Sequence, residues 1–202
     1  MKSNPNIKKA FSILSISIII FSYIFSSGVL LFNPRAAHAA TYTVTNNNDS
    51  GAGSLRQAII DANTNPGTDI IVFDNTYTIQ PTSALPSIDD PVEINGYTGS
   101  PGGATANSAA SPSPFNGTIK VELDGQLAGA VDGLLFLAGS EGSSVRGLAI
   151  NRFQFAGIQI QSSSNITIAG NYIGTSADGT TNLGNGINGV YINGTSTGNV
   201  VG

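Results

Sequence analysis

The chain has 202 residues, a net charge of −4 at neutral pH, no cysteine and a single histidine. The absence of cysteine excludes disulfide bonds, so hydrophobic packing and backbone hydrogen bonds must hold the fold. Eight Lys and Arg residues against twelve Asp and Glu residues exclude the clustered positive charge that binding of nucleic acid requires.

The N-terminus contains the three parts of an export signal. Three lysines precede an uncharged, mostly apolar run over residues 11–32, and the small-residue motif Ala37-His38-Ala39 follows. This order predicts a signal peptide over residues 1–39 that is cleaved between Ala39 and Ala40. The apolar run has 22 residues, longer than the usual core of about 7 to 15, so an uncleaved membrane anchor is the alternative.

Cleavage would change the charge of the protein. Residues 40–202 keep four of the eight basic residues and all twelve acidic ones, a net charge of −8, while His38 leaves with the signal. The loss of histidine excludes Ser/His nucleophile pairs and histidine metal sites. The four remaining cations, Arg56, Lys120, Arg146 and Arg152, argue against tight binding of an anionic polysaccharide unless metal ions supply positive charge.

The first mature segment predicts a strand and then a short helix. Residues 41–46 alternate polar and apolar side chains, as expected for a strand with one buried face. Ser54 with Gln57 forms a capping box, and an apolar stripe follows on a helix that ends at Asn63. The stripe consists of Leu55, Ala58, Ile59 and Ala62. Because so short a helix does not persist alone, we expect it to cover the open end of a stack of strands.

Five later segments share one template, an apolar, a variable and an apolar residue followed by Asn, Asp or Gly. They are residues 71–74, 92–95, 121–124, 148–151 and 171–174, and the last departs from the template at its first position. If Phe73, Ile94, Leu123, Ile150 and Ile173 are equivalent, the spacings are 21, 29, 27 and 23. Such short units of period 2 exclude a helical solenoid and predict a β-solenoid with strands about 4.8 Å apart. The predicted outward column is Val72, Glu93, Glu122, Ala149 and Tyr172.

Two further sets of segments repeat in the second half of the chain. Leu134, Ile158 and Val190 are spaced by 24 and 32 residues, and Val145, Ile168 and Val200 by 23 and 32. Three strands per coil are therefore expected, with Leu135, Gln159 and Tyr191 outward in the first set and a polar insertion over residues 175–184. The last coil is incomplete at Gly202, so we interpret residues 40–202 as the N-terminal part of a longer β-helix domain.

Residues 97–118 interrupt the pattern. They are rich in Gly, Pro and Ser and show no periodicity, so they form an excursion from one coil. The excursion is either a flexible surface loop or a flap that walls a ligand groove.

The segment over residues 43–59, followed by Ile71-Val72-Phe73, resembles the N-terminal region of secreted bacterial proteins with the right-handed parallel β-helix (pectin-lyase-like) fold and a CSLREA-type motif. Gly53 and Gln57 stand where that motif has Cys and Glu. The resemblance covers most of residues 41–202. It implies an all-β, right-handed parallel β-helix with a capping helix, but no particular activity, because this fold carries lyases, hydrolases, epimerases and adhesins.

Glu93 and Glu122 form the main candidate site. In one outward column they would place like charges on neighbouring coils, which favours either a raised carboxyl pKa or a bound cation. The pair would then be catalytic carboxylates, or Glu93, Glu122 and Asp124 would bind Ca²⁺. The alternative is that both glutamates are solvated, or that the excursion separates them.

Other polar residues give weaker candidates. Arg146 and Arg152 have no carboxylate at the aligned outward positions, so we expect them to be surface residues. Asp178-Gly179 is either a small Ca²⁺ loop or a plain turn, and the turn is favoured. The rings of Tyr172 and Tyr191 are suited to stacking on sugars.

Together these patterns favour a secreted or cell-surface bacterial protein with a structural or adhesive role. Extracellular polysaccharide or other cell-surface components are the candidate partners, and contact with a membrane is expected only through the signal segment. The alternative is a Ca²⁺-dependent polysaccharide lyase or another polysaccharide-active enzyme, such as a glycoside hydrolase, centred on Glu93 and Glu122. A non-enzymatic role is favoured because no compact cluster of acid, base and arginine is apparent.

Overall fold

The computed structural model describes residues 38–98, 101–108 and 115–202. Residues 1–37, which make up most of the predicted signal peptide, lie outside the described residues. Residues 36–202 belong to one compact unit, referred to below as the second unit, and its described part is all-β, with parallel sheets and one α-helix. In the part of the chain that the structure describes, no helix combines the length and apolar character needed to span a membrane.

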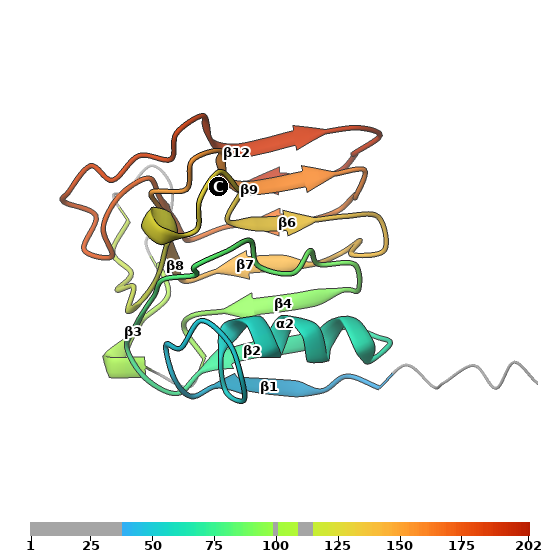
Figure 1. Cartoon of the computed structure of the whole chain (residues 1–202), viewed down its shortest axis with the longest axis horizontal. Coiled ribbons are helices and arrows are strands. Elements are labelled where there is room, and N and C mark those ends of the chain that lie inside the picture. The colour runs from blue at the N-terminus through green and yellow to red at the C-terminus, as the bar shows by residue number, and fades with distance from the viewer. Residues whose placement is uncertain (1–37, 99–100, 109–114) are drawn as a thin grey trace, which may run out of the picture. The chain divides into compact units, whose positions relative to one another are not determined.

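Three parallel sheets make up the second unit (Figure 1). Sheet A contains, in spatial order, β1 (Thr41–Val44), β2 (Asp69–Phe73), β4 (Val92–Asn95), β7 (Ser144–Arg146), β10 (Thr167–Ile168) and β13 (Val200–Val201). Sheet B contains β3 (Tyr77–Ile79), β5 (Val121–Asp124), β8 (Leu148–Asn151) and β11 (Tyr172–Ile173). Sheet C contains β6 (Leu134–Phe136), β9 (Ala156–Gln161) and β12 (Asn188–Asn193). Two short 3-10 helices, η1 (Pro101–Gly103) and η2 (Gly125–Leu127), lie in the connections.

The order of the strands brings the sheets together around one core. From β7 onward the chain passes through sheets A, B and C twice and then returns to A, and each new strand pairs in parallel with the strand one pass earlier. Inward residues of the three sheets, among them Phe73, Phe136, Ile94 and Ile150, form a single buried cluster with Phe153 of the connection between β8 and β9. Alternation along each strand therefore leaves every second side chain outside.

The helix α2 (Leu55–Thr64) forms as predicted. The Ser54 hydroxyl accepts a hydrogen bond from the Gln57 N–H at 3.2 Å, and the whole predicted stripe is buried. The Gln57 side chain donates to Asp61 instead of closing the capping box, and the helix continues to Thr64 rather than stopping at Asn63. The helix contacts β1 and β2, the first strands of sheet A, at the end of the stack where a cover was expected (Figure 1).

The predicted five-residue column is wrong, because its members belong to two sheets. In sheet A, Ile71 pairs with Ile94, and Ile94 pairs with Val145. In sheet B, Leu123 pairs with Ile150, which in turn pairs with Ile173. The template does not distinguish the sheets, because an apolar residue at every second position serves the core equally well from either of them.

Of the other two predicted sets of aligned residues, one is confirmed in full and the other in part. Leu134, Ile158 and Val190 are in register in sheet C. In sheet A, Val145 aligns with Ile168 as predicted, but Ile168 aligns with Val201 and not with Val200. Val200 and Val201 are adjacent and equally apolar, so the sequence pattern does not indicate which of them aligns with Ile168. The Asn199 side chain, which accepts a hydrogen bond from the Ile166 N–H at 2.8 Å, lies just before the strand and helps to fix this register.

Candidate functional site

The outer face of sheet B carries one row of side chains from four strands. Thr78 pairs with Glu122, Glu122 with Ala149, and Ala149 with Tyr172. The last three follow the order predicted for the outward column. Ala149 is fully buried although it points outward, so other parts of the chain cover this side of the sheet.

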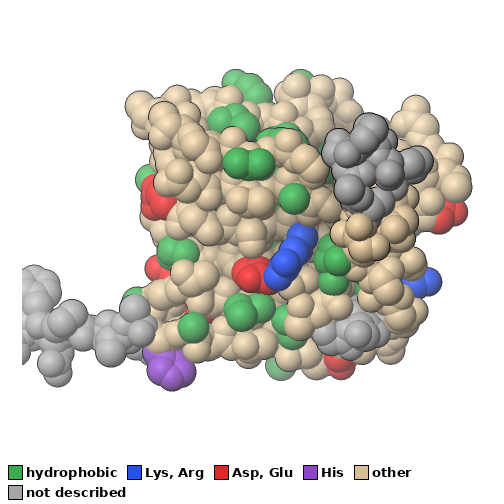
Figure 2. Space-filling model, turned by 180° about the vertical axis from the view of Figure 1, so that it is seen from behind, with side chains coloured by type: hydrophobic (Ala, Val, Ile, Leu, Met, Phe, Trp, Pro, Cys, Tyr) green, Lys and Arg blue, Asp and Glu red, His purple; other side chains and the backbone are tan. Residues whose placement is uncertain are grey.

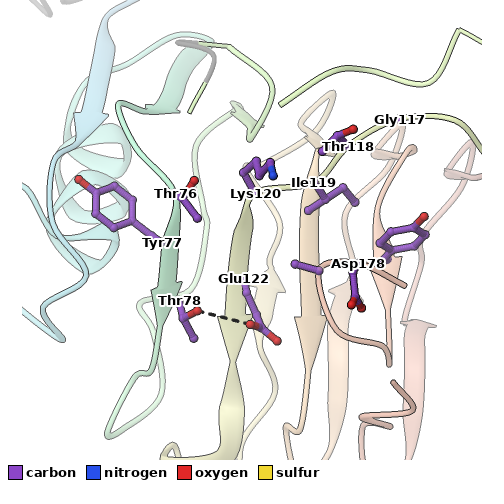
Figure 3. A pocket seen from close by; sticks show the side chains of 11 residues that line it. Thr76, Tyr77, Thr78, Gly117, Thr118, Ile119, Lys120, Glu122 and Asp178 are labelled. Atoms are coloured by element: carbon purple, nitrogen blue, oxygen red, sulfur yellow. Dashed lines mark hydrogen bonds between the residues drawn. The ribbon is translucent and has the colours of Figure 1, made fainter. Parts of the chain in front are cut away.

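A cavity of about 390 Å³ lies over this row (Figure 3). Three parts of the chain line it. They are the sheet itself with its flanking residues (Thr76, Tyr77, Thr78, Ile119, Lys120, Glu122, Tyr172), the end of the excursion (Gly117, Thr118) and the loop after β11 (Ala177, Asp178). In Figure 3, Lys120 and Glu122 lie along one strand, Thr78 lies on the neighbouring strand, and Asp178 projects from the loop beyond them.

The described part of the excursion packs against the fold. Within the excursion, Thr105 and Thr118 form an antiparallel bridge, and its Phe115 ring packs against Tyr172 of β11, with centroids 5.0 Å apart and ring planes at 57°. At the other end, the Tyr97 hydroxyl donates to the Gly170 carbonyl at 2.5 Å, and burial raises the pKa of Tyr97. The described residues of the excursion therefore contact the rest of the fold, and two of them line the cavity. Residues 99–100 and 109–114 lie outside the description.

The cavity holds one cation and two carboxylates. Among the described residues, Arg56, Arg146 and Arg152 each form an ion pair, whereas Lys120 forms none. The Glu122 carboxylate accepts a hydrogen bond from the Asn151 amide at 2.7 Å and a long one from the Thr78 hydroxyl at 3.4 Å. Lys120 is therefore free to bind a ligand, and Glu122 is held in place by its neighbours.

The loop after β11 fixes the second carboxylate. Asp178 accepts hydrogen bonds from the Ser176 hydroxyl and from the backbone N–H of Thr180 at 3.0 Å, which lower the pKa of Asp178 to about 2. Gly179 follows with φ of 73°, and its N–H donates to the Ser176 carbonyl. The favoured interpretation of Asp178-Gly179 as a turn is confirmed.

Tyr77 supplies a phenol at the side of the cavity. Burial and the hydrogen bond from its hydroxyl to Asp74, at 2.6 Å, raise the pKa of Tyr77 to about 12. The phenol stays protonated at neutral pH.

Glu93 and Glu122 do not form the predicted pair. Glu93 belongs to sheet A, where it lies between Ile70 and Ser144, while Glu122 belongs to sheet B. The Glu93 carboxylate forms an ion pair with Arg146 and accepts a hydrogen bond from the Asn95 amide at 2.8 Å. The prediction that Glu93 and Glu122 place like charges in one outward column is therefore wrong.

Asp124 is occupied by donors from the protein. It is fully buried, and its two oxygens accept hydrogen bonds from the Arg152 guanidinium, from the Gln80 amide at 2.5 Å and from the Gln126 N–H at 3.1 Å. Within the described ranges, no group of three or more His, Cys, Asp or Glu side chains is placed to hold a metal ion. The predicted Ca²⁺ site required Glu93, Glu122 and Asp124 to lie together, and the structure does not bring these three carboxylates together.

The expectation that Arg146 and Arg152 lack carboxylate neighbours is also wrong. Arg146 aligns with Asn95, two residues from Glu93, and Arg152 reaches Asp124 from a left-handed backbone position with φ of 59°. Asp124 and Asn151 end equivalent segments of the repeated template and pair in sheet B. Because Arg152 directly follows Asn151, this alignment could have indicated its ion pair with Asp124. Figure 2, which shows the side opposite to that of Figure 1, has only scattered charged side chains on a mostly uncharged surface.

A second cavity, of about 450 Å³, lies on the outer face of sheet C. It is lined by Asp132, Phe155, Ala156, Gln159, Ile187, Asn188 and Tyr191. Gln159 and Tyr191 are in register with Leu135, as predicted. Sequence patterns missed Phe155 and Ile187 because both lie in connecting segments without periodicity. The two candidate tyrosines, Tyr172 and Tyr191, therefore occupy different cavities on different sheets.

Comparison with known proteins gives no match to a family model, to a curated protein or to a solved structure.

Proposed function

We propose that the chain is a right-handed parallel β-helix of a secreted or surface-attached bacterial protein, and that its cavity on sheet B binds a neutral glycan in a structural or adhesive role. The repeated passage through sheets A, B and C supports the helix, and the strong right-handed preference of connections between parallel strands supports its handedness. The charged, apolar and small-residue parts of residues 1–39 support export.

The observation that carries the glycan proposal is the meeting of an aromatic ring, an unpaired ammonium group and a fixed carboxylate in one open cavity. Tyr172 is half-buried and braced by Phe115, so its ring is held in position. An aromatic face suits the apolar face of a sugar ring. Lys120, Glu122 and the threonine hydroxyls around them supply the donors and acceptors that sugar hydroxyls require.

The charge of the cavity favours a neutral ligand. One Lys and two carboxylates line it, a net charge of −1, and residues 40–202 carry −8 overall. A polymer with a negative charge on each sugar would be repelled by this field. Neutral glycans meet no such barrier.

A binding experiment with matched aromatic variants tests the proposal. Exported protein is screened against neutral and acidic oligosaccharides, and the affinity for the best ligand is then measured for the Tyr172→Leu, Lys120→Gln and Tyr191→Leu variants. Tyr172→Leu should weaken binding by about threefold to tenfold, in line with the value of a stacked aromatic, and Tyr191→Leu should leave it unchanged. Equal losses in both tyrosine variants, or loss only in Tyr191→Leu, would contradict the assignment to sheet B.

The enzymatic alternative now rests on Glu122 without Glu93 as its neighbour. It is tested with uronate polymers and neutral polysaccharides, with and without Ca²⁺, by following the appearance of new chain ends. Turnover by the exported protein that is lost in the Glu122→Gln variant would replace the binding role with a catalytic one.

A further inference from the structure

A buried carboxylate at the start of β2 has no charge partner among the residues that the structure describes. Asp69 is fully buried, and its Oδ1 accepts hydrogen bonds from the Ala40 N–H at 2.7 Å and from the Asn65 amide at 2.8 Å. Its Oδ2 has no hydrogen-bond partner, and none of the ion pairs among the described residues includes Asp69. A buried carboxylate in this state costs free energy unless a positive charge approaches it.

Ala40 is the residue that the predicted signal cleavage would make the N-terminus. A signal peptidase hydrolyses the Ala39–Ala40 bond, so that water adds across the amide and leaves a carboxylate on Ala39 and an amine on Ala40. An α-amino group has a pKa of about 7.7 to 8.0, so this amine takes up a proton at neutral pH. The Ala40 nitrogen, already 2.7 Å from Asp69, would then carry a full positive charge and three hydrogens.

We infer that Asp69 is the receptor for the α-ammonium group that signal cleavage creates at Ala40, so that processing supplies the charge partner that the buried carboxylate lacks. The inference rests on the predicted cleavage between Ala39 and Ala40.

The strand β1 fixes the nitrogen in place. The Ala40 carbonyl accepts a hydrogen bond from the Ile70 N–H at 2.9 Å, and the next residue, Thr41, pairs with Ile70. Because β2 presents Asp69 directly before Ile70, pairing of β1 with β2 holds the Ala40 nitrogen beside the carboxylate. The extra hydrogens of an ammonium are thereby brought close to Oδ2.

Removal of His38 and Ala39, the two described residues before the predicted cleavage point, uncovers no core. His38 and Ala39 are exposed, and their removal breaks the hydrogen bonds that His38 makes with the Pro66 carbonyl and the Asn65 amide. The Asn65 amide keeps its bond to Asp69.

Two further acidic side chains, Asp89 and Asp90, lie near this site. The pKa of Asp90, which accepts a hydrogen bond from the Gly67 N–H, is raised by burial and by the neighbouring charges of Asp69 and Asp89. A negative neighbourhood stabilises a cation at the Ala40 nitrogen.

The test compares two exported proteins that differ in charge at one nitrogen. The full chain is expressed in a bacterial host that exports it, and the mature N-terminus is sequenced. A second form carries Gly-Ser inserted between Ala39 and Ala40, so that cleavage leaves the Ala40 nitrogen as a neutral amide. This amide keeps the 2.7 Å hydrogen bond seen here, and because Ala39 is exposed, the added residues have room.

The processed protein should begin at Ala40, and its ratio of folded to unfolded molecules should exceed that of the extended form by at least about tenfold, since removing one partner of a buried ion pair is costly. The difference should disappear in the Asp69→Asn background. Should that variant not fold, reactivity of the α-amine supplies a second readout, because a paired ammonium resists acylation at pH 7.5 and a free one does not. A different N-terminus, equal stability of the two forms, or an α-amine as reactive as that of the extended form would overturn the inference.

Discussion

At the level of single residues, three ion pairs in the described part of the chain contribute to the stability of the fold. The carboxylates of Asp49, Glu93 and Asp124 are each paired with an arginine, although these arginines differ in exposure. Among the described ion pairs, only that of Asp124 and Arg152 has a fully buried partner. The two arginines at the ends of β7 and β8 therefore make a matched comparison.

Arg152→Met should lower the free energy of unfolding by about 2 to 4 kcal/mol, because it leaves the Asp124 carboxylate buried without a cation. The lower part of this range is expected, since 34% of the Arg152 side chain is exposed. Arg146→Met, on a side chain that is 49% exposed, should cost less than about 1 kcal/mol. Urea unfolding of both variants measures the difference. Equal costs would show that burial of Asp124 does not decide the strength of its ion pair.

The titration of Asp178 tests the geometry of the loop beside the cavity. Its pKa is lowered to about 2 by hydrogen bonds from Ser176 and Thr180, so these bonds are present above the ordinary value of 3.8 and are lost as the pH falls toward 2. An NMR titration should show the Asp178 carboxyl changing below pH 3, together with the Thr180 amide. A midpoint near 3.8 would mean that the turn does not hold the carboxylate as described.

At the scale of elements, the corners between sheets restrict the fold more tightly than the strands do. Gly96 follows β4 and Gly147 follows β7, and the two corners stack closely. A Cβ built on Gly96 would lie 2.1 Å from the Gly147 carbonyl oxygen. By contrast, a Cβ on Gly184 would meet nothing closer than the Asn182 Oδ1 at 3.6 Å.

Gly96→Ala should therefore destabilise the protein by at least about 2 kcal/mol, because neither backbone can move without disturbing its strand. Gly184→Ala should change stability by less than about 1 kcal/mol. Thermal or urea unfolding compares the two. A tolerated Gly96→Ala would show that the corner after β4 and the corner after β7 lie further apart than described.

Local sequence patterns were enough to predict some elements of the fold but not how the strands are arranged in sheets. Local patterns predicted α2 and the repeated short strands, because periodicity and capping act within a few residues. They failed to assign Glu93 and Glu122 to different sheets, because the same apolar–x–apolar unit satisfies both. The ion pair of Arg152 with Asp124 and the cavity over Tyr172 depend on register between strands and on two connecting loops. Those features arise only from the assembled fold.

For the whole molecule, the distribution of charge bears on the choice of ligand. The chain has few cations, three of the four in residues 40–202 are paired, and charged side chains are sparse on the face shown in Figure 2. Binding of a neutral glycan should therefore change little between 50 and 500 mM salt, since no ion pair forms. A steep loss of affinity with salt, measured by calorimetry, would indicate an anionic ligand held by Lys120.

The most direct test of the proposed function is an NMR map of the amides that shift when the exported protein binds its best neutral oligosaccharide. We expect the shifts to gather at residues 76–78, 117–122, 172 and 177–178, which are separated along the chain and meet only at the cavity on sheet B. Shifts gathered around Phe155, Ile187 and Tyr191, or no shifts with any neutral glycan, would contradict the account.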